Sequence, residues 1–467
     1  MKRIGILTAG GDTPALNATL YGAVTRANQR RIEVYGFIKG FSSLLNPRMP
    51  HLHLNPLFST LPELDPSRGG TILGASRDYV DNDNQQAIGE ISERLQKLDL
   101  GGLICVGGDG TLNGMQALCN ALPTVLAPKT IDNDLGLNYR NESDEFARVP
   151  DAKAPHGYVY RRTPPKTKGF HLDQMINYVT PGYATAVFVS NRGIQCIRST
   201  AESHRRVAII EVMGRHSGYI ALGAAFGQPD ILLVPEHPIN IELVVERVKE
   251  IYELQKHVVI VCAEGIVDQN GQELGAAKSS TDPAGNVVLS GASEALRQIL
   301  IERLQDDYFT SKRRNESAKA AIFTRKVGHT QRGGPPILFD RFYAAQLGGH
   351  AVDMLLEGQM NAVSILNWSD ARGFYLDSIP ANDFRDRYGL IHARKMHPSF
   401  FDPDIMKPSH LGNEYLRPIF TSCIGPEDLE SMRNSLFDPG NLTRPYRSVN
   451  TDVHKRIRYL DGDETAS

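Results

Sequence analysis

Two short segments combine glycine with carboxylates and a cation in a pattern that suits phosphate chemistry. Residues 104–114 (ICVGGDGTLNG) have the pattern of a buried strand, a glycine turn and the start of a helix. Gly108 and Gly110 leave no Cβ in the way of a ligand, and Asp109 places a carboxylate beside the turn. Such a turn could hold a polyphosphate over a helix N-terminus, with Mg²⁺ near the carboxylate.

The companion segment, residues 127–135 (APKTIDNDL), places Asp132 and Asp134 beside Lys129 and Thr130. A carboxylate next to a phosphate-binding turn is a candidate base for a substrate hydroxyl. Four basic residues further along the chain suit a second anion: Arg206, Arg215, His329 and Arg332. Two anion sites around a group of carboxylates fit phosphoryl transfer to a phosphorylated acceptor.

An alternation of strands and helices must position these residues. The apolar patterns predict strands at 3–7, 33–38, 103–106, 124–127, 206–211, 231–234, 257–262, 320–323 and 362–366. They predict helices at 14–27, 86–98, 112–122, 183–200, 241–255, 291–306 and 339–356. This order is typical of an α/β fold with parallel sheets. The pattern breaks between residue 136 and about residue 179, and again after about residue 377. We expect the polar segment from about residue 441 to be disordered.

Composition excludes several classes of function. The chain has 467 residues with 51 Lys and Arg against 53 Asp and Glu, so no charge excess favours a nucleic acid or an acidic membrane as partner. Five cysteines lie far apart without a CxxC pair, which fits a reducing compartment. No stretch approaches the roughly 18 apolar residues of a membrane span. We therefore expect a cytoplasmic protein.

Seven motifs occur in the order found in one known family. They are GGDTP at 10–14, LGASR at 73–77, GGDGT at 107–111, PKTIDND at 128–134, EVMGR at 211–215, AEG at 263–265 and GHTQRGG at 328–334. Together they span most of residues 2–366. Because it carries this set of motifs, the chain resembles the 6-phosphofructokinase family. The resemblance implies two Rossmann-like doubly wound domains with a central insertion and a C-terminal extension.

The resemblance also implies where each substrate binds. Residues 1–135 with about 337–377 would form the phosphoryl-donor domain, and 180–336 the sugar-phosphate domain. Residues 136–179 would be the insertion, and 378–467 the extension. Residues implied to bind ATP are Gly10, Gly11, Arg77, Gly108, Asp109, Gly110 and Thr111, with Asp109 holding Mg²⁺. Residues implied to bind fructose 6-phosphate are Thr130, Asp132, Arg206, Met213, Gly214, Arg215, Glu264, His329 and Arg332.

Within that set the resemblance assigns catalytic roles. Asp132 would be the base on the 1-hydroxyl of the sugar, with Thr130 and Asp134 flanking it, and Lys129 and Arg215 would assist. Arg206 matches an arginine that reaches in from a neighbouring subunit, which implies a homodimer or homotetramer.

Two positions bear on the phosphoryl donor. Pyrophosphate-dependent members of the family typically carry an aspartate where Gly110 stands, which fills the space of the α-phosphate of ATP. The same members typically carry a lysine at the position of Lys129, where the short bacterial ATP enzymes have glycine. Glycine removes the block to ATP, whereas lysine adds a cation that either donor tolerates. We therefore expect ATP.

Other readings stay open. They are a reversible pyrophosphate-dependent phosphofructokinase, an ATP kinase of another phosphosugar such as sedoheptulose 7-phosphate, and a regulatory subunit without catalysis. The chain also departs from the family. Tyr21 and Thr25 replace arginines that bind an allosteric nucleotide in the short bacterial enzymes. Phe323 replaces a sugar-phosphate arginine, for which Arg325 or Lys326 could substitute.

Overall fold

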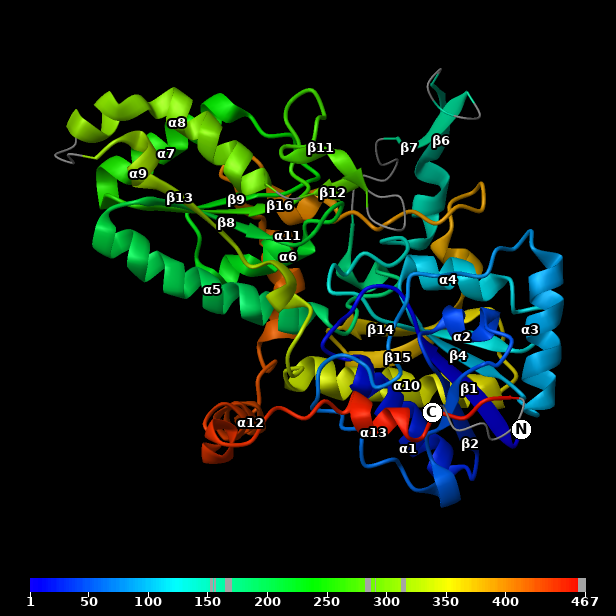
Figure 1. Ribbon diagram of the computed structural model, residues 1–467. Helices are drawn as coiled ribbons and strands as arrows, with labels where there is room; N and C mark the ends of the chain where they lie inside the picture. The colour runs from blue at the N-terminus through cyan, green and yellow to red at the C-terminus, as the bar shows by residue number, and fades with distance from the viewer. Residues whose placement is uncertain are drawn as a thin grey trace.

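The computed structural model describes residues 1–460 except 152–153, 155–156, 164–169, 282–286, 290 and 312–315. Two sheets form the frame of the molecule (Figure 1). The larger sheet has seven strands in the order β15-β14-β5-β4-β1-β2-β3, and the smaller has four in the order β13-β8-β10-β9. This is the α/β architecture that the alternation of patterns predicts.

The larger sheet is parallel at its centre and antiparallel at both edges. Its strands are β1 (Arg3–Thr8), β2 (Glu33–Phe37), β3 (His51–His53), β4 (Leu103–Gly107), β5 (Thr124–Pro128), β14 (Ala362–Ser369) and β15 (Gly373–Pro380). Strands β3 and β15 run antiparallel to their neighbours. After forming the smaller sheet, the chain returns to the larger one at residue 362, where β14 pairs with β5.

Helices cover both faces of the larger sheet (Figure 1). On one face lie α1 (Leu16–Gln29) and α10 (Leu338–Leu356), and on the other α2 (Phe41–Leu45), α3 (Gln85–Lys97) and α4 (Asp109–Gln116). A short 3-10 turn, η1 (Pro56–Phe58), follows β3. Strands buried on both faces explain the unbroken apolar runs at β1, β4 and β5.

Two glycines allow α1 and α10 to pack in close contact. A Cβ built on Gly22 would lie 1.9 Å from the carbonyl oxygen of Ala345, and one on Gly348 would lie 2.0 Å from that of Thr19. Any larger residue would push the helices apart. Helix α1 begins at Leu16, five residues after Gly11, so this packing holds the helix that follows the Gly10–Gly11 turn.

The smaller sheet is parallel throughout. Its strands are β8 (Val207–Val212), β9 (Ile231–Leu233), β10 (Val258–Ala263) and β13 (Ile322–Lys326). On one side lie α5 (Tyr183–His204), α6 (Tyr219–Gly223) and η4 (Ala224–Gly227), and on the other α7 (Ile241–Gln255), α8 (Ala292–Ser311) and α9 (Ala318–Ala321) (Figure 1). A β-ribbon of β11 (Ala276–Thr281) and β12 (Val287–Leu289) precedes α8, and η5 (Gly328–Gln331) follows β13.

The segment from 136 to 179, expected to be irregular, contains regular structure. It has η2 (Arg140–Glu145), an antiparallel hairpin of β6 (Phe146–Pro150) and β7 (Tyr158–Arg162), and η3 (Leu172–Gln174). Residues 164–169 of this segment lie outside the described residues. The Arg148 guanidinium of the hairpin lies over the rings of Tyr158 and Tyr160 in β7 and of Tyr388 in the C-terminal extension.

The C-terminal extension differs from the expectation in two ways. It contains η6 (Ala381–Phe384), η7 (Pro398–Phe400), a two-stranded β16 (Phe401–Asp402) and β17 (Lys407–Pro408), α11 (His410–Phe420), α12 (Pro426–Leu436), η8 (Pro439–Leu442) and α13 (Asn450–His454). Residues 441–460 are ordered rather than disordered, because Val449, Val453 and Ile457 pack on the core of the larger sheet. Residues 461–467 of the expected tail lie outside the described residues.

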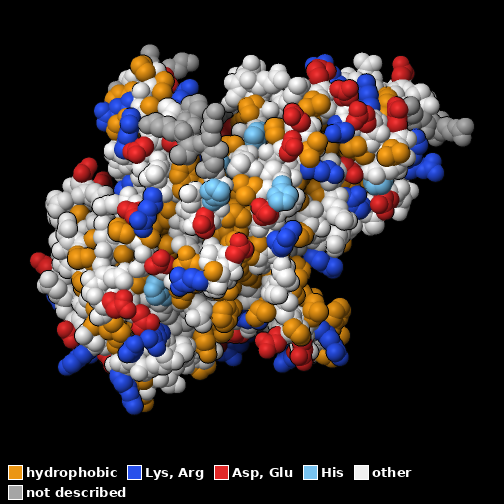
Figure 2. All heavy atoms as spheres, turned by 180° about the vertical axis from the view of Figure 1, so that it is seen from behind, with side chains coloured by type: hydrophobic (Ala, Val, Ile, Leu, Met, Phe, Trp, Pro, Cys, Tyr) orange, Lys and Arg blue, Asp and Glu red, His pale blue; other side chains and the backbone are white. Residues whose placement is uncertain are grey.

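The end of the described chain also covers an edge of the larger sheet. The amides of His51 in β3 and Arg458 each donate to the carbonyl of the other, at 3.0 and 2.8 Å. Helix α12 projects from the rest of the molecule (Figure 1). Leu429 and Leu436 of this helix and the adjacent Phe437 are exposed, and hydrophobic side chains gather on the projecting part in the view from behind (Figure 2). No helix among the described residues is both long and apolar enough to cross a membrane.

Candidate active site

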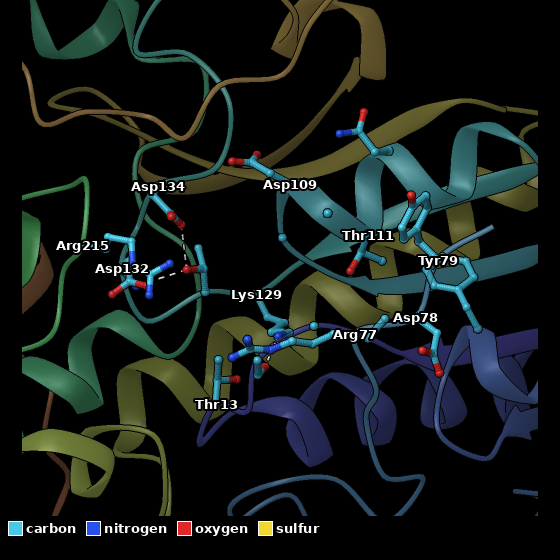
Figure 3. A pocket seen from close by; sticks show the side chains of 18 of the residues that line it. Thr13, Arg77, Asp78, Tyr79, Asp109, Thr111, Lys129, Asp132, Asp134 and Arg215 are labelled. Atoms are coloured by element: carbon cyan, nitrogen blue, oxygen red, sulfur yellow. Dashed lines mark hydrogen bonds between the residues drawn. The ribbon is translucent and has the colours of Figure 1, made fainter. Parts of the chain in front are cut away.

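The carboxyl ends of strands from both sheets face one cavity of about 940 Å³ (Figure 3). Side chains that follow β1, β4 and β5 line one wall, and those that follow β8, β10 and β13 line the other. Open parallel sheets bind ligands at this edge. Of the residues that the sequence analysis assigns to the site, all but Arg206 and Gly214 line the cavity.

The turn after β4 forms the first phosphate candidate. Gly108 stands just before α4, whose first turn carries Asp109, Gly110 and Thr111. The buried hydroxyls of Thr111 and of Thr13, both lining the cavity, have no hydrogen-bond partner among the described residues. Amides at a helix start and two unpartnered hydroxyls are suited to phosphate oxygens.

Gly110 leaves space in the cavity. A Cβ built on it meets no atom within 4 Å, so the site could accommodate a side chain there only at the expense of ligand volume.

Lys129, at the end of β5, connects two turns of the phosphate wall. Its ammonium is buried and donates a hydrogen bond to the carbonyl of Gly11. Burial and the nearby Arg332 guanidinium lower the pKa of Lys129 to about 8, against the opposing effect of Asp12 and other carboxylates. The side chain therefore keeps a positive charge near neutral pH, next to the Gly10–Gly11 turn.

The loop after β5 holds the central carboxylates. The Thr130 hydroxyl donates to Asp134 Oδ1 at 2.8 Å, and its oxygen accepts from the Asp132 amide at 3.1 Å (Figure 3). Burial and the Asp134 carboxylate raise the pKa of Asp132 to about 7, although Arg332 opposes the shift. A carboxylate that titrates near neutrality is suited to act as a general base.

Cations on the opposite wall face this loop. Arg332 Nη2 lies 3.8 Å from Asp132 Oδ2, and Arg332 Nη1 donates to the carbonyl of Asp12 at 3.4 Å. Figure 3 shows Arg215 beside Asp132 and Asp134, away from Thr111 and Tyr79. One end of the cavity is therefore rich in cations close to the candidate base.

Three further residues complete this wall. Met213, Glu264 and His329 line the cavity, and the Met213 amide donates to Gln331 Oε1 at 2.9 Å. Burial raises the pKa of Glu264, and Arg215 opposes it. Gly214 does not line the cavity but forms the turn before Arg215 with a φ of +123°, which favours glycine.

Asp109 is the candidate metal ligand. Its Oδ1 accepts from the Gly136 amide at 3.2 Å, and burial together with the Asp134 carboxylate raises its pKa well above the usual range. Within the described residues no group of three or more His, Cys, Asp or Glu side chains is arranged to hold a metal ion. Mg²⁺ commonly binds one or two carboxylates together with substrate phosphates and waters. The acidic pair of Asp109 and Asp134 fits that mode of binding.

Sequence reasoning missed the far end of the cavity. Arg77, which it predicted, lines the cavity, but so do Phe41, Tyr79 and Asn113, which it did not assign. Phe41 is in α2 and Asn113 in α4, whereas Tyr79 follows Arg77 after one residue. These residues carry no motif of their own; only the aromatic ring just past the LGASR motif offered a local signal.

Two expectations concern residues away from the cavity. Arg206 precedes the amino end of β8, opposite to the end that carries Arg215, and its buried Nε has no partner among the described residues. Phe323 packs on the core of the smaller sheet, and Lys326 pairs with Glu211 Oε1 at 3.3 Å. Arg325 lies exposed on the same face of β13 as Phe323.

Comparison with known proteins finds phosphofructokinases both by family model and by pairwise similarity. The sequence model described as Phosphofructokinase matches residues 3–139 and 172–355. The chain is 35% identical over 374 residues to an ATP-dependent 6-phosphofructokinase 2 of Streptomyces coelicolor, covering 79% of this chain and 92% of the relative. It is 32% identical over 371 residues to a pyrophosphate–fructose 6-phosphate 1-phosphotransferase of Amycolatopsis methanolica, covering 79% of this chain and 91% of the relative.

Solved structures share the fold. A pyrophosphate-dependent phosphofructokinase from Marinobacter aquaeolei superposes with a TM-score of 0.66 at 18% identity, covering 91% of this chain and 92% of that one. A phosphofructokinase from Saccharomyces cerevisiae gives a TM-score of 0.57 at 19% identity, covering 82% of this chain and 45% of that one. At these identities the likeness concerns the fold alone.

Proposed function

The chain belongs to the phosphofructokinase family, and from that premise we propose that it transfers the γ-phosphoryl group of Mg-ATP to the 1-hydroxyl of fructose 6-phosphate. The products are fructose 1,6-bisphosphate and ADP. Relatives with this activity and relatives that use pyrophosphate are both similar to the chain, so the choice of donor rests on the site itself.

Asp132 is the proposed base. Its ionised carboxylate takes the proton of the 1-hydroxyl as the oxygen attacks the phosphorus, and the adjacent Asp134 is oriented by Thr130. Arg332 and Arg215 lie on the wall opposite this loop and would bind the phosphate of the sugar, with Met213, Glu264 and His329 around the ring. Gly214 would act through the turn that presents Arg215. The sugar is thereby held with its hydroxyl toward the donor.

The donor would lie along the turn after β4. Gly108, Gly110 and Thr111 would contact its phosphates, together with Gly10, Gly11 and Arg77. Asp109 would hold Mg²⁺, which neutralises phosphate charge when it is bound. Lys129, whose pKa of about 8 leaves it charged near neutral pH, would place a cation beside the transferred group.

One observation carries the choice of ATP: the cavity continues past an unobstructed Gly110 to the rings of Phe41 and Tyr79. Pyrophosphate has no group for such a region, whereas an adenine base can pack on aromatic side chains. The second candidate is the pyrophosphate-dependent activity, which the buried ammonium of Lys129 favours.

Initial rates with fructose 6-phosphate and Mg²⁺ test the proposal, with ATP or pyrophosphate as donor. We expect activity with ATP and at least 100-fold less with pyrophosphate. Activity with pyrophosphate alone would establish the second candidate. If fructose 6-phosphate reacts with neither donor but sedoheptulose 7-phosphate reacts with ATP, the acceptor is a different phosphosugar.

The proposal includes an oligomer. Arg206 lies outside the cavity of its own subunit, at the opposite end of β8, and would bind the sugar phosphate of a neighbouring subunit. A homodimer or homotetramer would satisfy this arrangement.

A further inference from the structure

Three consecutive residues of the C-terminal extension, Arg394–Met396, connect loops from both walls of the site. The Arg394 amide donates to the carbonyl of Asp134 at 2.6 Å, and the Lys395 carbonyl accepts from Asn138 Nδ2 at 3.0 Å. The Met396 amide donates to Glu236 Oε1 at 2.8 Å. A segment remote in sequence therefore joins the carboxylate loop to the smaller sheet.

The Arg394 side chain extends this link. It is among the largest fully buried side chains, yet its guanidinium binds backbone carbonyls. Nε and Nη2 donate to the carbonyl of Asn133 at 2.9 and 2.6 Å, and Nη1 donates to that of Asn177 at 2.5 Å. The guanidinium carbon lies 5.1 Å from the centroid of the Tyr219 ring. The planar fork of arginine fits this geometry, and a lysine could not reproduce it.

Asn133, which Arg394 holds, separates the two central carboxylates. It has a φ of +53°, in the left-handed region. Its Nδ2 donates to the Tyr415 hydroxyl at 2.7 Å, and its Oδ1 accepts from the amide and hydroxyl of Thr180 at 3.0 and 3.1 Å. Such a backbone conformation persists when its surroundings over-determine it. Arg394 and Tyr415 belong to the extension, so the extension fixes the direction of the carboxylate loop.

The other end of the link reaches the cation wall. Glu236 Oε1 accepts from the Gly218 amide at 2.8 Å as well as from Met396. Gly218 lies three residues after Arg215, in the same turn between β8 and α6. The 394–396 segment therefore holds both the loop of the candidate base and the loop of a sugar-phosphate cation.

We propose that Arg394 is a positioning residue for the reaction: it holds Asn133 so that the Asp132 carboxylate faces the acceptor hydroxyl at a fixed distance from Arg215. This rests on the proposed function, in which Asp132 is the base. Arg394 itself does not line the cavity.

Arg94 provides a matched control. It is also a buried arginine, and its Nη1 donates to the carbonyls of Leu44 and Asn46 at 2.6 and 3.2 Å. It belongs to α3 and does not line the cavity. Arg394→Lys and Arg94→Lys therefore each disturb donation to two backbone carbonyls, beside the base in the first variant and remote from it in the second. Arg94→Lys also disturbs the ion pair of Arg94 with Glu90 at 2.9 Å.

The test measures kcat, both KM values and Tm of the full-length variants. Misplacing a reacting group by about 1 Å can cost about 100-fold in rate, so we expect Arg394→Lys to lower kcat about 10- to 100-fold and KM to change less than about threefold. Arg94→Lys should lower Tm but leave kcat within about twofold of the wild type. A kcat of Arg394→Lys equal to that of Arg94→Lys would reduce Arg394 to a structural role and overturn the proposal.

Tyr415→Phe supplies a second test that does not depend on the stability of Arg394→Lys. It keeps the ring and removes the hydroxyl that Asn133 contacts. We expect a lower kcat and faster amide hydrogen exchange across 131–135 than in the wild type. Unchanged kcat and exchange would contradict the proposal. If the wild type lacks activity, the proposed function fails, and hydrogen exchange alone still decides whether the extension holds this loop.

Discussion

The Asp132 carboxylate is subject to opposing influences on its pKa. Burial and Asp134 raise the pKa to about 7, and Arg332 opposes them. Only the ionised form can accept a proton, so below this pKa the active fraction falls about tenfold per pH unit. We expect kcat/KM for the sugar phosphate to rise with pH up to about 7 and to fall again above about 8, where Lys129 loses its positive charge. Initial rates at low substrate between about pH 5.5 and 9 check this, and a flat profile across pH 6–8 would contradict it.

Replacing the base separates chemistry from binding. Asp132→Asn keeps the shape of the side chain and its proximity to Arg332 but cannot accept the proton. Because general-base catalysis contributes about 10²- to 10⁴-fold, we expect kcat to fall by that order. Sugar-phosphate binding, measured by the rise in Tm that fructose 6-phosphate produces, should persist. A variant with near-normal kcat would rule out this base.

Gly110 allows the donor hypothesis to be tested by charge. Its Cβ position is open, so Gly110→Ala adds volume without meeting any atom. Gly110→Asp adds a carboxylate where the donor phosphates would lie. We expect Gly110→Asp to raise KM for ATP at least about tenfold through charge repulsion, and Gly110→Ala to have a much smaller effect. Equal KM values in the two variants would contradict the account of donor choice.

The sequence predicted those site residues that belong to a motif. It did not predict residues that reach the site only because the fold brings distant segments together. Asp132 and Gly110 belong to runs whose composition already indicates phosphate chemistry. Phe41 and Tyr79 belong to no phosphate-binding motif, and only the folded sheet brings both to one cavity. Arg394 is separated from Asn133 by 261 residues and belongs to no motif, so no local pattern predicts the contact.

At the scale of elements, the contact of α1 with α10 depends on single glycines. Adjacent positions of α10 offer a matched pair: a Cβ on Gly348 would lie 2.0 Å from a carbonyl of α1, whereas one on Gly349 would lie no closer than 3.6 Å to any atom. We expect Gly348→Ala to destabilise the fold by about 1–3 kcal/mol through overpacking. Gly349→Ala should be neutral or stabilise it by up to about 1 kcal/mol. Thermal unfolding compares them, and equal Tm values would contradict this packing argument.

Elements with strong periodicity were predictable, and those with mixed composition were not. The unbroken apolar runs gave the central strands of both sheets to within a few residues. The β6–β7 hairpin escaped notice because β7, YVYRR, has no regular alternation of apolar and polar residues and lies in a segment of mixed charge. Helix α13 is short and polar, and the apolar residues that anchor it are Val453 within the helix and Val449 and Ile457 on either side of it. The expected domain boundaries stay a prediction.

At the scale of the whole molecule, the shared-site arrangement predicts complementation between subunits. Asp132→Asn and Arg206→Ala should each be far less active alone. If Arg206 acts across an interface, a hybrid dimer has one site with both residues intact. Mixing the two variants in equal amounts under exchange should restore about a quarter of the sites. Rates before and after exchange measure this, and no recovery in verified hybrids would place Arg206 outside the neighbouring site.

The return of the chain to its first sheet has a consequence for biosynthesis. Strand β5 leaves the ribosome long before β14, its neighbour, which begins at Ala362. Until then the nascent polypeptide exposes the edge of an apolar strand, a known template for wrong pairing. A chaperone that holds this edge during translation would therefore raise the yield of native protein, and ribosomes stalled before codon 362 should carry aggregation-prone chains.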